Sequence, residues 1–413
     1  MKDAIQLTFG SYGHTLHHCQ IMSPDNQWIV YDTRNADGDI GITTRIERVN
    51  IETKKVEILY EVQGANLFGP GVGAVTYSPT KERVIFIHGL NNASAGKPYS
   101  MTRRSGVAID TQCPNQPISM DARNVISPYT KGALRGGTHS HCWNHDGSKI
   151  SFTYNDAVLE KNNLPNERVV GVMFPKKVVV SENDLVENFS GEMFSVIVSK
   201  IVPQAKPTSD EIEKAFDECW LGNTNSLVFQ GWVRDEFDNR KTEIFKVSLP
   251  DTLKEENFGL PLQGTKDTLP NVPKGVNQAR LTFTNKGLSS FRHWLRSSPD
   301  GDKVYFLMED ENEIINIFEL EVKSGIINQL TFHNNSIHSP FNLSPNGKQL
   351  VYFSNYSIYL FNLDLSVSKL LLETDLYLYG IPNFDKSGKF ILFNKYVADS
   401  SGTQFLQIFK ISL

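Results

Sequence analysis

The sequence predicts an all-β protein whose chain closes into a ring of seven similar sheets, a seven-bladed β-propeller. Three observations support this fold class. A strand–turn–strand pattern recurs along the whole chain, a short apolar motif recurs between the later copies, and the composition suits many short strands and turns. Hydrophobic residues form 39% of the 413 residues, with 29 glycines and 25 phenylalanines, which argues against a disordered chain.

The repeated unit is clearest between Arg135 and Asp156, where two segments flank an Asp-Gly turn at residues 144–147. In the second segment apolar and polar residues alternate, as expected for a strand of an antiparallel hairpin with one buried face. Hairpins of this kind are expected near residues 18–35, 71–88, 135–156, 219–230, 288–309, 336–355 and 379–396. Seven copies at this spacing favour a propeller over a β-sandwich.

The two ends of the chain are expected to share one blade. Residues 5–9, IQLTF, resemble 280–283 (RLTF) and 329–332 (QLTF), which we expect to be outermost strands of their blades. The last repeat has only its hairpin and a third strand at 404–413. The N-terminal segment would therefore supply the missing fourth strand and close a single domain spanning residues 1–413.

The middle blades are expected to carry insertions, because two blades share the 154 residues between His145 and Pro299. These inserted loops lie near residues 178–213 and 249–278. The segment SDEIEKAF, residues 209–216, predicts a short capped helical turn.

The net charge and the lack of targeting signals limit which partners and which cellular compartment we expect for the protein. A net charge of −5 offers no global attraction to nucleic acid or to an anionic membrane surface, so we expect neither as a partner. The chain as given shows no spanning apolar segment and no signal peptide, which predicts a cytoplasmic protein. Its four cysteines form no CxxC pair, and we interpret Cys19 and Cys142 as packed thiols.

The histidines gather at one end of the expected central channel when the repeats are aligned on their turn residues. Six residues before the turn, His18, His139 and His293 occupy this position in three of the seven repeats. His17 and His338 lie seven residues before the turn in theirs. Imidazoles that converge from separate strands are a usual way to bind a divalent transition metal. We therefore predict a divalent metal held by His18, His139 and His293, with His338 as a candidate fourth ligand.

Polar residues near these histidines would form a shell suited to an anionic or hydroxyl-rich ligand. They are Arg34, Asp32, Tyr154, Asn155, Asp156, Arg135 and Arg292. The alternative interpretation is structural, because a histidine before the first strand of a propeller blade often hydrogen-bonds within its own blade. We assign that structural role to His14. The glycine pair Gly136–Gly137 is interpreted as a turn former.

Two enzyme classes are disfavoured by absent motifs. No serine lies in a G-x-S-x-G nucleophile motif, which excludes a prolyl-oligopeptidase-like enzyme, and no paired carboxylates occupy matching channel positions, which argues against an ordinary glycosidase.

The repeats SPDNQWIVYDT, SSPDGDKVYFL and SPNGKQLVYFS resemble the WD-like repeats of TolB-type propellers over essentially the whole chain. More narrowly, YDTR with IERVNIET, and RGGTHSH with DGSKISFTYND, resemble a bacterial propeller family similar to the oligogalacturonate lyases. Those enzymes are seven-bladed cytoplasmic propellers that hold manganese with histidines and a glutamine. They gather these ligands mainly from later blades, whereas the nearest histidine pair here is His139 with His141, and no glutamine matches the fourth ligand.

This resemblance implies a metal-dependent β-elimination on acidic, uronate-containing oligosaccharides, with Mn²⁺ as the expected metal. His141 or His17 would be the base, and Arg292 or Arg135 would pair with the substrate carboxylate. Two alternatives stay open. One is a non-catalytic TolB-like propeller that binds a protein or sugar ligand at its rim, and the other is a metal-dependent hydrolase or isomerase of a sugar derivative.

Overall fold

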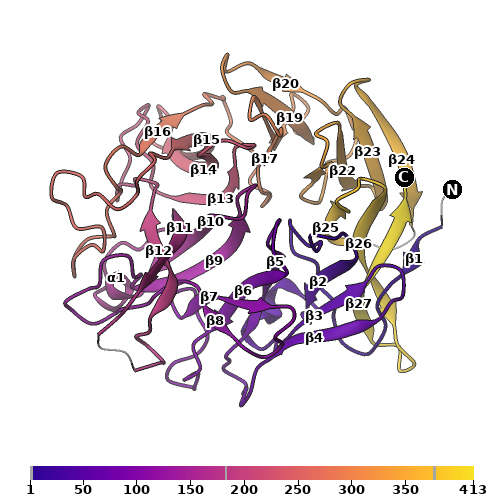
Figure 1. The fold of residues 1–413 in the computed structure, drawn as a ribbon. Coiled ribbons are helices and arrows are strands. Elements are labelled where there is room, and N and C mark those ends of the chain that lie inside the picture. Colours follow the sequence, from indigo (N-terminus) through magenta and orange to yellow (C-terminus); the bar gives the residue numbers. More distant parts are fainter. Residues whose placement is uncertain (1–2, 182–183, 375–377) are drawn as a thin grey trace.

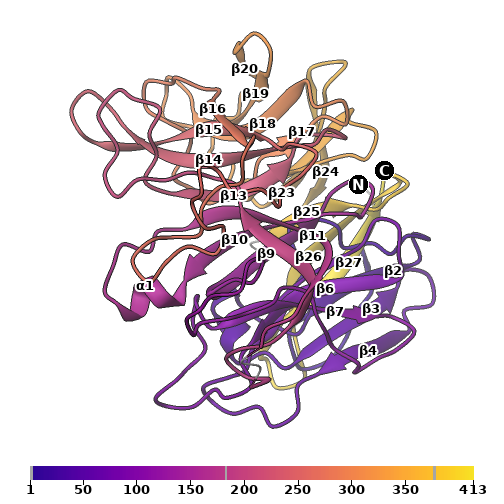
Figure 2. The ribbon, with the colours of Figure 1, turned by 60° about the vertical axis from the view of Figure 1, so that its left-hand side comes forward.

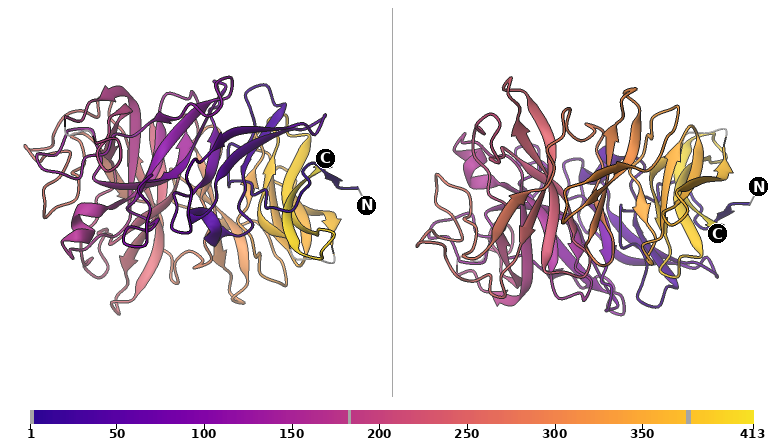
Figure 3. Two further views of the ribbon diagram at one scale, coloured as in Figure 1. Left: turned by 90° about the horizontal axis from the view of Figure 1, so that it is seen from below. Right: turned by 90° about the horizontal axis from the view of Figure 1, so that it is seen from above.

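The computed structural model describes residues 3–181, 184–374 and 378–413. Its strands form seven antiparallel sheets arranged in a ring, and this confirms the predicted seven-bladed propeller (Figure 1). Six of the sheets are built from consecutive strands, and the seventh combines the last three strands with the first. Seen from the side, the ring is a disc whose strands run between two faces that carry the loops (Figure 3).

The first three blades use the N-terminal part of the chain. Blade 1 contains β2 (Trp28–Asp32), β3 (Arg45–Asn50) and β4 (Val56–Glu61), with a 3-10 helix at Asp37–Gly41. Blade 2 contains β5 (Val72–Tyr77), β6 (Arg83–Gly89), β7 (Arg104–Asp110) and β8 (Ile118–Ser119). Blade 3 contains β9 (Gly136–Trp143), β10 (Ile150–Asp156), β11 (Val169–Val178) and β12 (Gly191–Ile197), and the short helix α1 (Ala157–Lys161) lies at its outer side (Figure 2).

The later blades follow the same order. Blade 4 contains β13 (Ala215–Trp220), β14 (Ser226–Arg234), β15 (Arg240–Ser248) and β16 (Asn277–Arg280). Blade 5 contains β17 (Arg296–Ser297), β18 (Lys303–Glu309), β19 (Ile315–Glu321) and β20 (Ile327–Gln329). Blade 6 contains β21 (Asn342–Leu343), β22 (Gln349–Ser354), β23 (Ser357–Asn362) and β24 (Val367–Glu373). Blade 7 contains β25 (Tyr379–Phe384), β26 (Phe390–Ala398) and β27 (Gln404–Ser412), completed by β1 (Ile5–Gln6).

The two ends of the chain close the ring as the sequence predicts. Strand β1 pairs antiparallel with β27, with Ile5 opposite Lys410, and the amide of Leu7 donates to the carbonyl of Ile408 at 2.8 Å. The edge that an open array would leave exposed is therefore paired.

Neighbouring blades hold together through apolar faces. Between blades 4 and 5, for example, Val228 and Ile244 pack with Val304 and Phe306, all of them fully buried. Alternating apolar residues on each strand reach both neighbouring sheets, so every blade shares its core with the next.

The inner strands of blades 2, 3 and 4 are bulged near the channel. Ala74, Ser140 and Asp217 have φ values of 55°, 57° and 49°, and the pairing register shifts at each of these residues. A bulge re-aims the side chains around it. The residues before each bulge therefore need not follow the simple alternation on which the sequence alignment depended.

The structure corrects two local predictions. Residues 209–216 form no helix, because Ala215 already begins β13, which pairs along β14. The pair Gly136–Gly137 begins β9 and does not form a turn. Glycine is needed at residue 137 because a Cβ there would lie 2.1 Å from the carbonyl oxygen of Met101.

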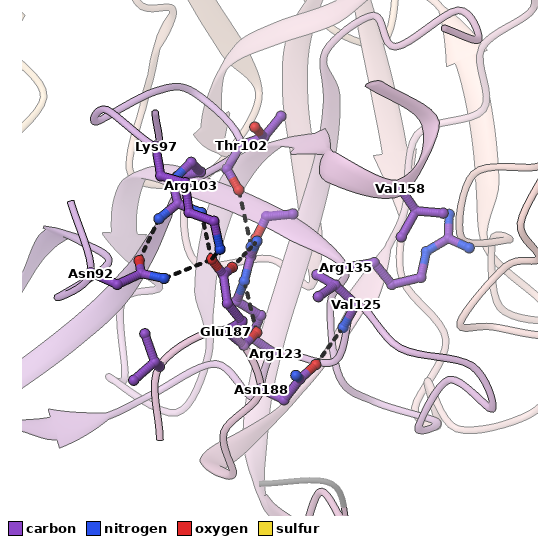
Figure 4. A network of polar contacts seen from close by, with 12 residues as sticks. Asn92, Lys97, Thr102, Arg103, Arg123, Val125, Arg135, Val158, Glu187 and Asn188 are labelled. Carbon is purple, nitrogen blue, oxygen red and sulfur yellow. Dashed lines mark hydrogen bonds and ion pairs between the residues drawn. The ribbon is translucent and has the colours of Figure 1, made fainter. Parts of the chain in front are cut away.

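The loop between β11 and β12 is fixed to blade 2 by a polar network (Figure 4). The Glu187 carboxylate accepts from Arg103 at 2.6 Å and from Asn92 at 2.9 Å. Arg123, which is fully buried, donates to the carbonyl oxygens of Glu187, Thr102 and Gly136.

None of the helices among the described residues is long and apolar enough to cross a membrane.

Candidate functional site

Blade 1 lacks a regular inner strand, and the segment His17–Gln20 crosses the channel instead. The carbonyl oxygen of His18 accepts from Arg296 Nη2 of blade 5 at 2.9 Å and from Asn342 Nδ2 of blade 6 at 3.0 Å. The carbonyl oxygen of His17 accepts from Asn383 of blade 7 at 3.1 Å.

The side chain of Gln20 continues this crossing toward blade 3. The side-chain amide of Gln20 pairs with the main chain of Trp143 in both directions, at 2.7 and 2.9 Å, while the main-chain carbonyl of Gln20 accepts from the main-chain amide of Tyr77 in blade 2. The crossing segment is thus held by five other blades, so its side chains are fixed in the middle of the ring.

Two thiols and an imidazole meet where the crossing segment approaches β9. The sulfur atoms of Cys19 and Cys142 lie 3.3 Å apart, and Nε2 of His18 lies 3.8 Å from the first and 3.7 Å from the second. The ligand atoms of His17, His18 and Cys19 also lie within 4.8 Å of one another, as in a group that could hold a metal. We call Cys19, Cys142 and His18 the thiol–imidazole cluster.

His18 and Cys142 are buried and Cys19 is half-buried, and this burial shifts the pKa values of the cluster. Burial lowers the pKa of His18 to about 3, so this ring is neutral at ordinary pH. The hydrogen bond from Cys142 holds the pKa of Cys19 well below its usual value. The indole of Trp294 stacks on the His18 ring at 4.1 Å between centroids with an interplanar angle of 8°, which fixes the orientation of the ring.

A cavity of about 400 Å³ opens next to the cluster. Cys19, Cys142 and His18 line it together with Cys219, Glu218 and Arg296. Burial raises the pKa of Glu218 to about 8, so this carboxyl group is largely protonated at neutral pH. The sequence interpretation of Cys19 and Cys142 as packed thiols therefore misses that both face a cavity.

His139 lies in a cationic environment. It is buried, and among the residues that the structure describes neither of its ring nitrogens has a hydrogen-bond partner. Burial and then the positive charges of Arg104 and Arg168, with a smaller effect from Arg292, hold the pKa of His139 well below its usual value. A buried ring with two unpaired nitrogens needs an explanation, and a bound ligand is a natural one.

The three arginines differ in how far they are already paired. Arg104 donates to the Tyr99 hydroxyl at 3.0 Å, but its Nε, like the Nε of Arg168, has no partner among the described residues. Burial lowers the pKa of Arg168 to about 10, so it remains charged at neutral pH. Arg292 is 56% exposed and lies 3.3 Å from the Asp217 carboxylate. We call His139, Arg104, Arg168 and Arg292 the cationic site.

The cationic site and the thiol–imidazole cluster adjoin each other. The Arg292 guanidinium lies 4.4 Å from the ring centroid of Trp294, whose ring also stacks on His18. Burial, and then the nearby charges of His17 and Arg104, lower the pKa of His141 to about 3. His141 Nε2 lies 3.0 Å from the Thr138 hydroxyl.

The four histidines predicted as metal ligands do not form one group. Among the described residues, the group of ligand atoms that could hold a metal is His17, His18 and Cys19, which does not include His139, His293 or His338. His293 uses both ring nitrogens within its own blade, Nδ1 at 2.8 Å from the carbonyl of Phe291 and Nε2 at 3.1 Å from the amide of Leu307. His338 is half-buried just before β21. The hydrogen bonds of His293 within its own blade match the structural role that the sequence left open for such histidines.

Manganese does not fit the group that the structure does assemble. Mn²⁺ prefers carboxylate, carbonyl, water and imidazole ligands, whereas two of the three cluster ligands are sulfur atoms. The predicted manganese site is therefore not supported by the positions of its ligands.

Several predicted binding residues are engaged elsewhere. Arg135 and Asp156 form an ion pair at 2.6 Å with no exposed surface, and the Tyr154 hydroxyl donates to the same carboxylate at 2.9 Å. Arg135 also donates to the carbonyls of Thr265 and Thr268, and so anchors the long loop before β16. These three side chains present nothing to a ligand, which differs from their predicted catalytic and substrate-binding roles.

The remaining predicted residues also have structural partners. Arg34 forms a bidentate pair with the buried Asp32 at 2.7 and 2.9 Å, and Asp32 accepts from the amide of Ala74 at the bulge of blade 2. Asn155 donates to the carbonyl of Asn166. His14 is buried with Nδ1 at 3.1 Å from the Leu406 carbonyl, consistent with its expected structural role.

Sequence reasoning missed Arg104, Arg168 and the two cysteines. Arg104 and Arg168 lie at or beside the third strands of blades 2 and 3, so alignment of the first strands could not find them. A signal did exist for Cys142, because it lies at the same offset as Cys219, three residues before the turn residue of its repeat.

Comparison with known proteins places the chain in a family. Residues 71–189 match the family model described as a protein of unknown function, DUF3748. An Escherichia coli K12 protein, "Uncharacterized protein YidR", is 38% identical over 354 residues, which is 84% of this chain and 83% of the relative. The chain belongs to the YidR family.

Solved structures similar to this YidR-family chain show the same fold. An oligogalacturonate lyase in complex with manganese has a TM-score of 0.57 at 13% identity, covering 100% of this chain and 96% of the lyase. The oligogalacturonate lyase from Vibrio parahaemolyticus has a TM-score of 0.56 at 11% identity, covering 100% of this chain and 93% of the other. At this identity the likeness establishes the shared propeller fold alone.

Proposed function

We propose that this YidR-family protein is a carbohydrate-active enzyme that binds acidic, uronate-containing oligosaccharides at the cationic site and cleaves them by β-elimination. The observation that carries the proposal is His139, a buried imidazole whose two ring nitrogens have no hydrogen-bond partner among the described residues and whose pKa is lowered by the charges of three arginines as well as by burial. The likeness in fold to two oligogalacturonate lyases adds support to the choice of substrate class.

The arginines supply the recognition. A uronate carboxylate can accept charge-assisted hydrogen bonds from guanidinium groups, and the unpaired Nε atoms of Arg104 and Arg168 are donors without an acceptor in the described structure. Their positive charges would also stabilise the negative charge that develops on the carboxylate when the neighbouring C5 proton is removed. Arg292 is the exposed member and would meet the substrate first.

His139 is the group that we assign as the base. Its pKa is low in the free protein because of burial and nearby positive charge, so the ring is neutral and can accept a proton. A bound carboxylate would offset that positive charge and raise the pKa of His139, which makes it a stronger base only when substrate is present. His141, which also lowers the pKa of His139, and His17 are the bases predicted from the sequence and remain the alternatives.

The reaction balances without another reactant. The C5–H bond breaks and its proton goes to the imidazole, the C4–O bond breaks and a C4=C5 double bond forms. The departing sugar oxygen takes a proton from water, and the imidazolium returns its proton to the solvent, which restores the neutral base. No step passes through manganese, since the predicted ligands do not meet.

The test is incubation with oligogalacturonate and other acidic oligosaccharides while the ultraviolet absorbance of an unsaturated uronate is followed. Removing a general base typically costs about 10²–10⁴-fold in rate, so H139A should lose activity by that factor. H145A is the matched control, because His145 is an exposed turn residue and its removal should change nothing. R168A should mainly weaken binding.

Two results would contradict the proposal. Absence of both binding and turnover with every acidic oligosaccharide would refute the substrate class. Tight binding without unsaturated product, unaffected by H139A, would favour a non-catalytic sugar-binding propeller instead.

A further inference from the structure

We propose that Cys19, Cys142 and His18 form a binding site for a thiophilic divalent metal ion of the zinc type, not for manganese. This inference is independent of the proposed lyase activity. It rests on the geometry of the thiol–imidazole cluster, on the way the fold holds it, and on the chemistry of its ligands.

The three ligand atoms already have the spacing of a tetrahedral site. With Zn–S near 2.3 Å and Zn–N near 2.05 Å, tetrahedral angles require about 3.8 Å between two sulfurs and about 3.6 Å between sulfur and nitrogen. The observed separations are 3.3 Å for the sulfur pair and 3.8 and 3.7 Å for the two sulfur–nitrogen pairs. An ion could therefore be accommodated by shifts of about half an ångström.

The ligands come from two distant parts of the chain that the fold holds rigidly. Cys19 and His18 lie on the crossing segment, whose carbonyls are tied to blades 5, 6 and 7, while Cys142 lies on β9. Trp294 stacks on the imidazole and keeps its Nε2 directed toward the sulfurs. Such support around the ligands is what orients a metal site.

A metal dithiolate would leave the cluster nearly uncharged. Two thiolates balance one divalent cation, so the bound site is close to neutral. Arg296 Nη2 donates to the carbonyl of His18 at 2.9 Å, so the main chain anchors this guanidinium, and the Nδ1 of the ring lies further away at 3.4 Å.

The fourth position of the metal would face the cavity of about 400 Å³ that the cluster lines. Three protein ligands with an open fourth position are typical of zinc sites that bind water or a substrate, and Cys₂His is one of the known ligand sets. His17, whose ligand atom lies within 4.8 Å of those of His18 and Cys19, is the nearest further donor on the crossing segment.

Ligand type decides which metal is expected. Thiolates favour zinc and other soft or borderline ions, whereas manganese favours oxygen ligands. A competing outcome for two sulfurs 3.3 Å apart is a Cys19–Cys142 disulfide, which would remove both thiolates and abolish the site.

The experiment uses the full chain, purified under reducing, oxygen-free conditions and stripped of metal with a chelator. Titration with Co²⁺ should give the thiolate-to-cobalt charge-transfer band and the visible bands of a tetrahedral site at one ion per chain. Zn²⁺ should abolish both, and Mn²⁺ at the same concentration should not. Competition with a chromophoric chelator gives the zinc affinity.

Matched variants identify the ligands. C142S and C19S should each weaken zinc by more than the roughly 10–100-fold that loss of an outer partner costs. C113S is the control, because Cys113 is exposed and is not part of the cluster. This variant should bind zinc as tightly as the wild type does. C219S tests whether the third thiol of the cavity takes part, and we expect it to retain the charge-transfer band.

A second measurement needs no variant. Zinc should protect Cys19 and Cys142, but not Cys113, from alkylation, as mapped by mass spectrometry. A cobalt spectrum without thiolate charge transfer, equal alkylation with and without zinc, or a Cys19–Cys142 disulfide that persists under reductant would each overturn the inference. If the cysteine variants lose the metal but keep full lyase activity, the proposed function is unaffected. If the protein binds the metal but shows no lyase activity, the metal site is unaffected.

Discussion

Replacing Arg135 with methionine should destabilise the protein strongly, because it leaves Asp156 buried without its cation. Both side chains of the Arg135–Asp156 pair are fully buried, and they are 2.6 Å apart. Removing one partner of a buried ion pair typically costs about 3–5 kcal/mol. Asp156 keeps the Tyr154 hydroxyl and the amides of Val158 and Leu159, so we expect a loss near the lower figure.

The assay is urea unfolding followed by fluorescence and circular dichroism, which gives the free energy of unfolding for R135M against wild type. K348M is the control, since the Lys348–Asp364 pair is 61% and 62% exposed and should change stability by less than about 1 kcal/mol. The double variant R135M/D156N should lose less than the sum of the two single changes, because it leaves no unpaired charge. A loss below about 1 kcal/mol for R135M would refute the assignment of Arg135 as a structural anchor.

Two further predictions concern the channel and the strand β9. The pKa of Glu218 is raised to about 8 from 4.5, so the folded state holds a proton that the unfolded chain releases between these values. This group's contribution to folding therefore becomes less favourable as the pH rises through that window. E218Q should be more stable than wild type at about pH 9 but not at about pH 5, and equal pH dependence of the two urea midpoints would contradict this. G137A should give little folded protein, since its Cβ would lie 2.1 Å from the Met101 carbonyl oxygen. The control is G402A, at a position with open space but positive φ, which should lower the free energy of unfolding by only about 1 kcal/mol. Soluble yield and thermal unfolding measure both effects.

The fold could be predicted because each repeat encodes it locally. Alternating apolar residues set the strand faces, the Asp-Gly and Ser-Pro turns set the hairpins, and the unpaired third strand at the C-terminus required a partner from the N-terminus. These signals depend on neighbours a few residues apart, which a single sequence displays directly.

The site was predicted only in part, because an offset along a strand fixes which residues approach the channel but not where their side chains point. His139 and His293 share one offset, yet the ring of His139 has no hydrogen-bond partner among the residues that the structure describes, while His293 bonds within its own blade. The bulge at Ser140 shifts the register of β9 next to His139, whereas blade 5 has no described residue with positive φ in β17. Differences of this kind come from the tertiary contacts of each blade.

The crossing segment explains why the thiol–imidazole cluster could not be found one repeat at a time. A chain that leaves its sheet must form its main-chain hydrogen bonds elsewhere. Here the main-chain carbonyls of His17 and His18 accept hydrogen bonds from the side chains of Arg296, Asn342 and Asn383. Asn383 belongs to blade 7, which exists as a complete sheet only when β1 joins it. The positions of Cys19 and His18 therefore depend on ring closure, and Cys142 reaches them from blade 3 on the other side. Because the closed ring fixes these side chains before any ligand arrives, a metal would bind without the entropic cost of ordering them. The cluster is thus a property of the whole ring, created where the first repeat departs from the pattern that the other six follow.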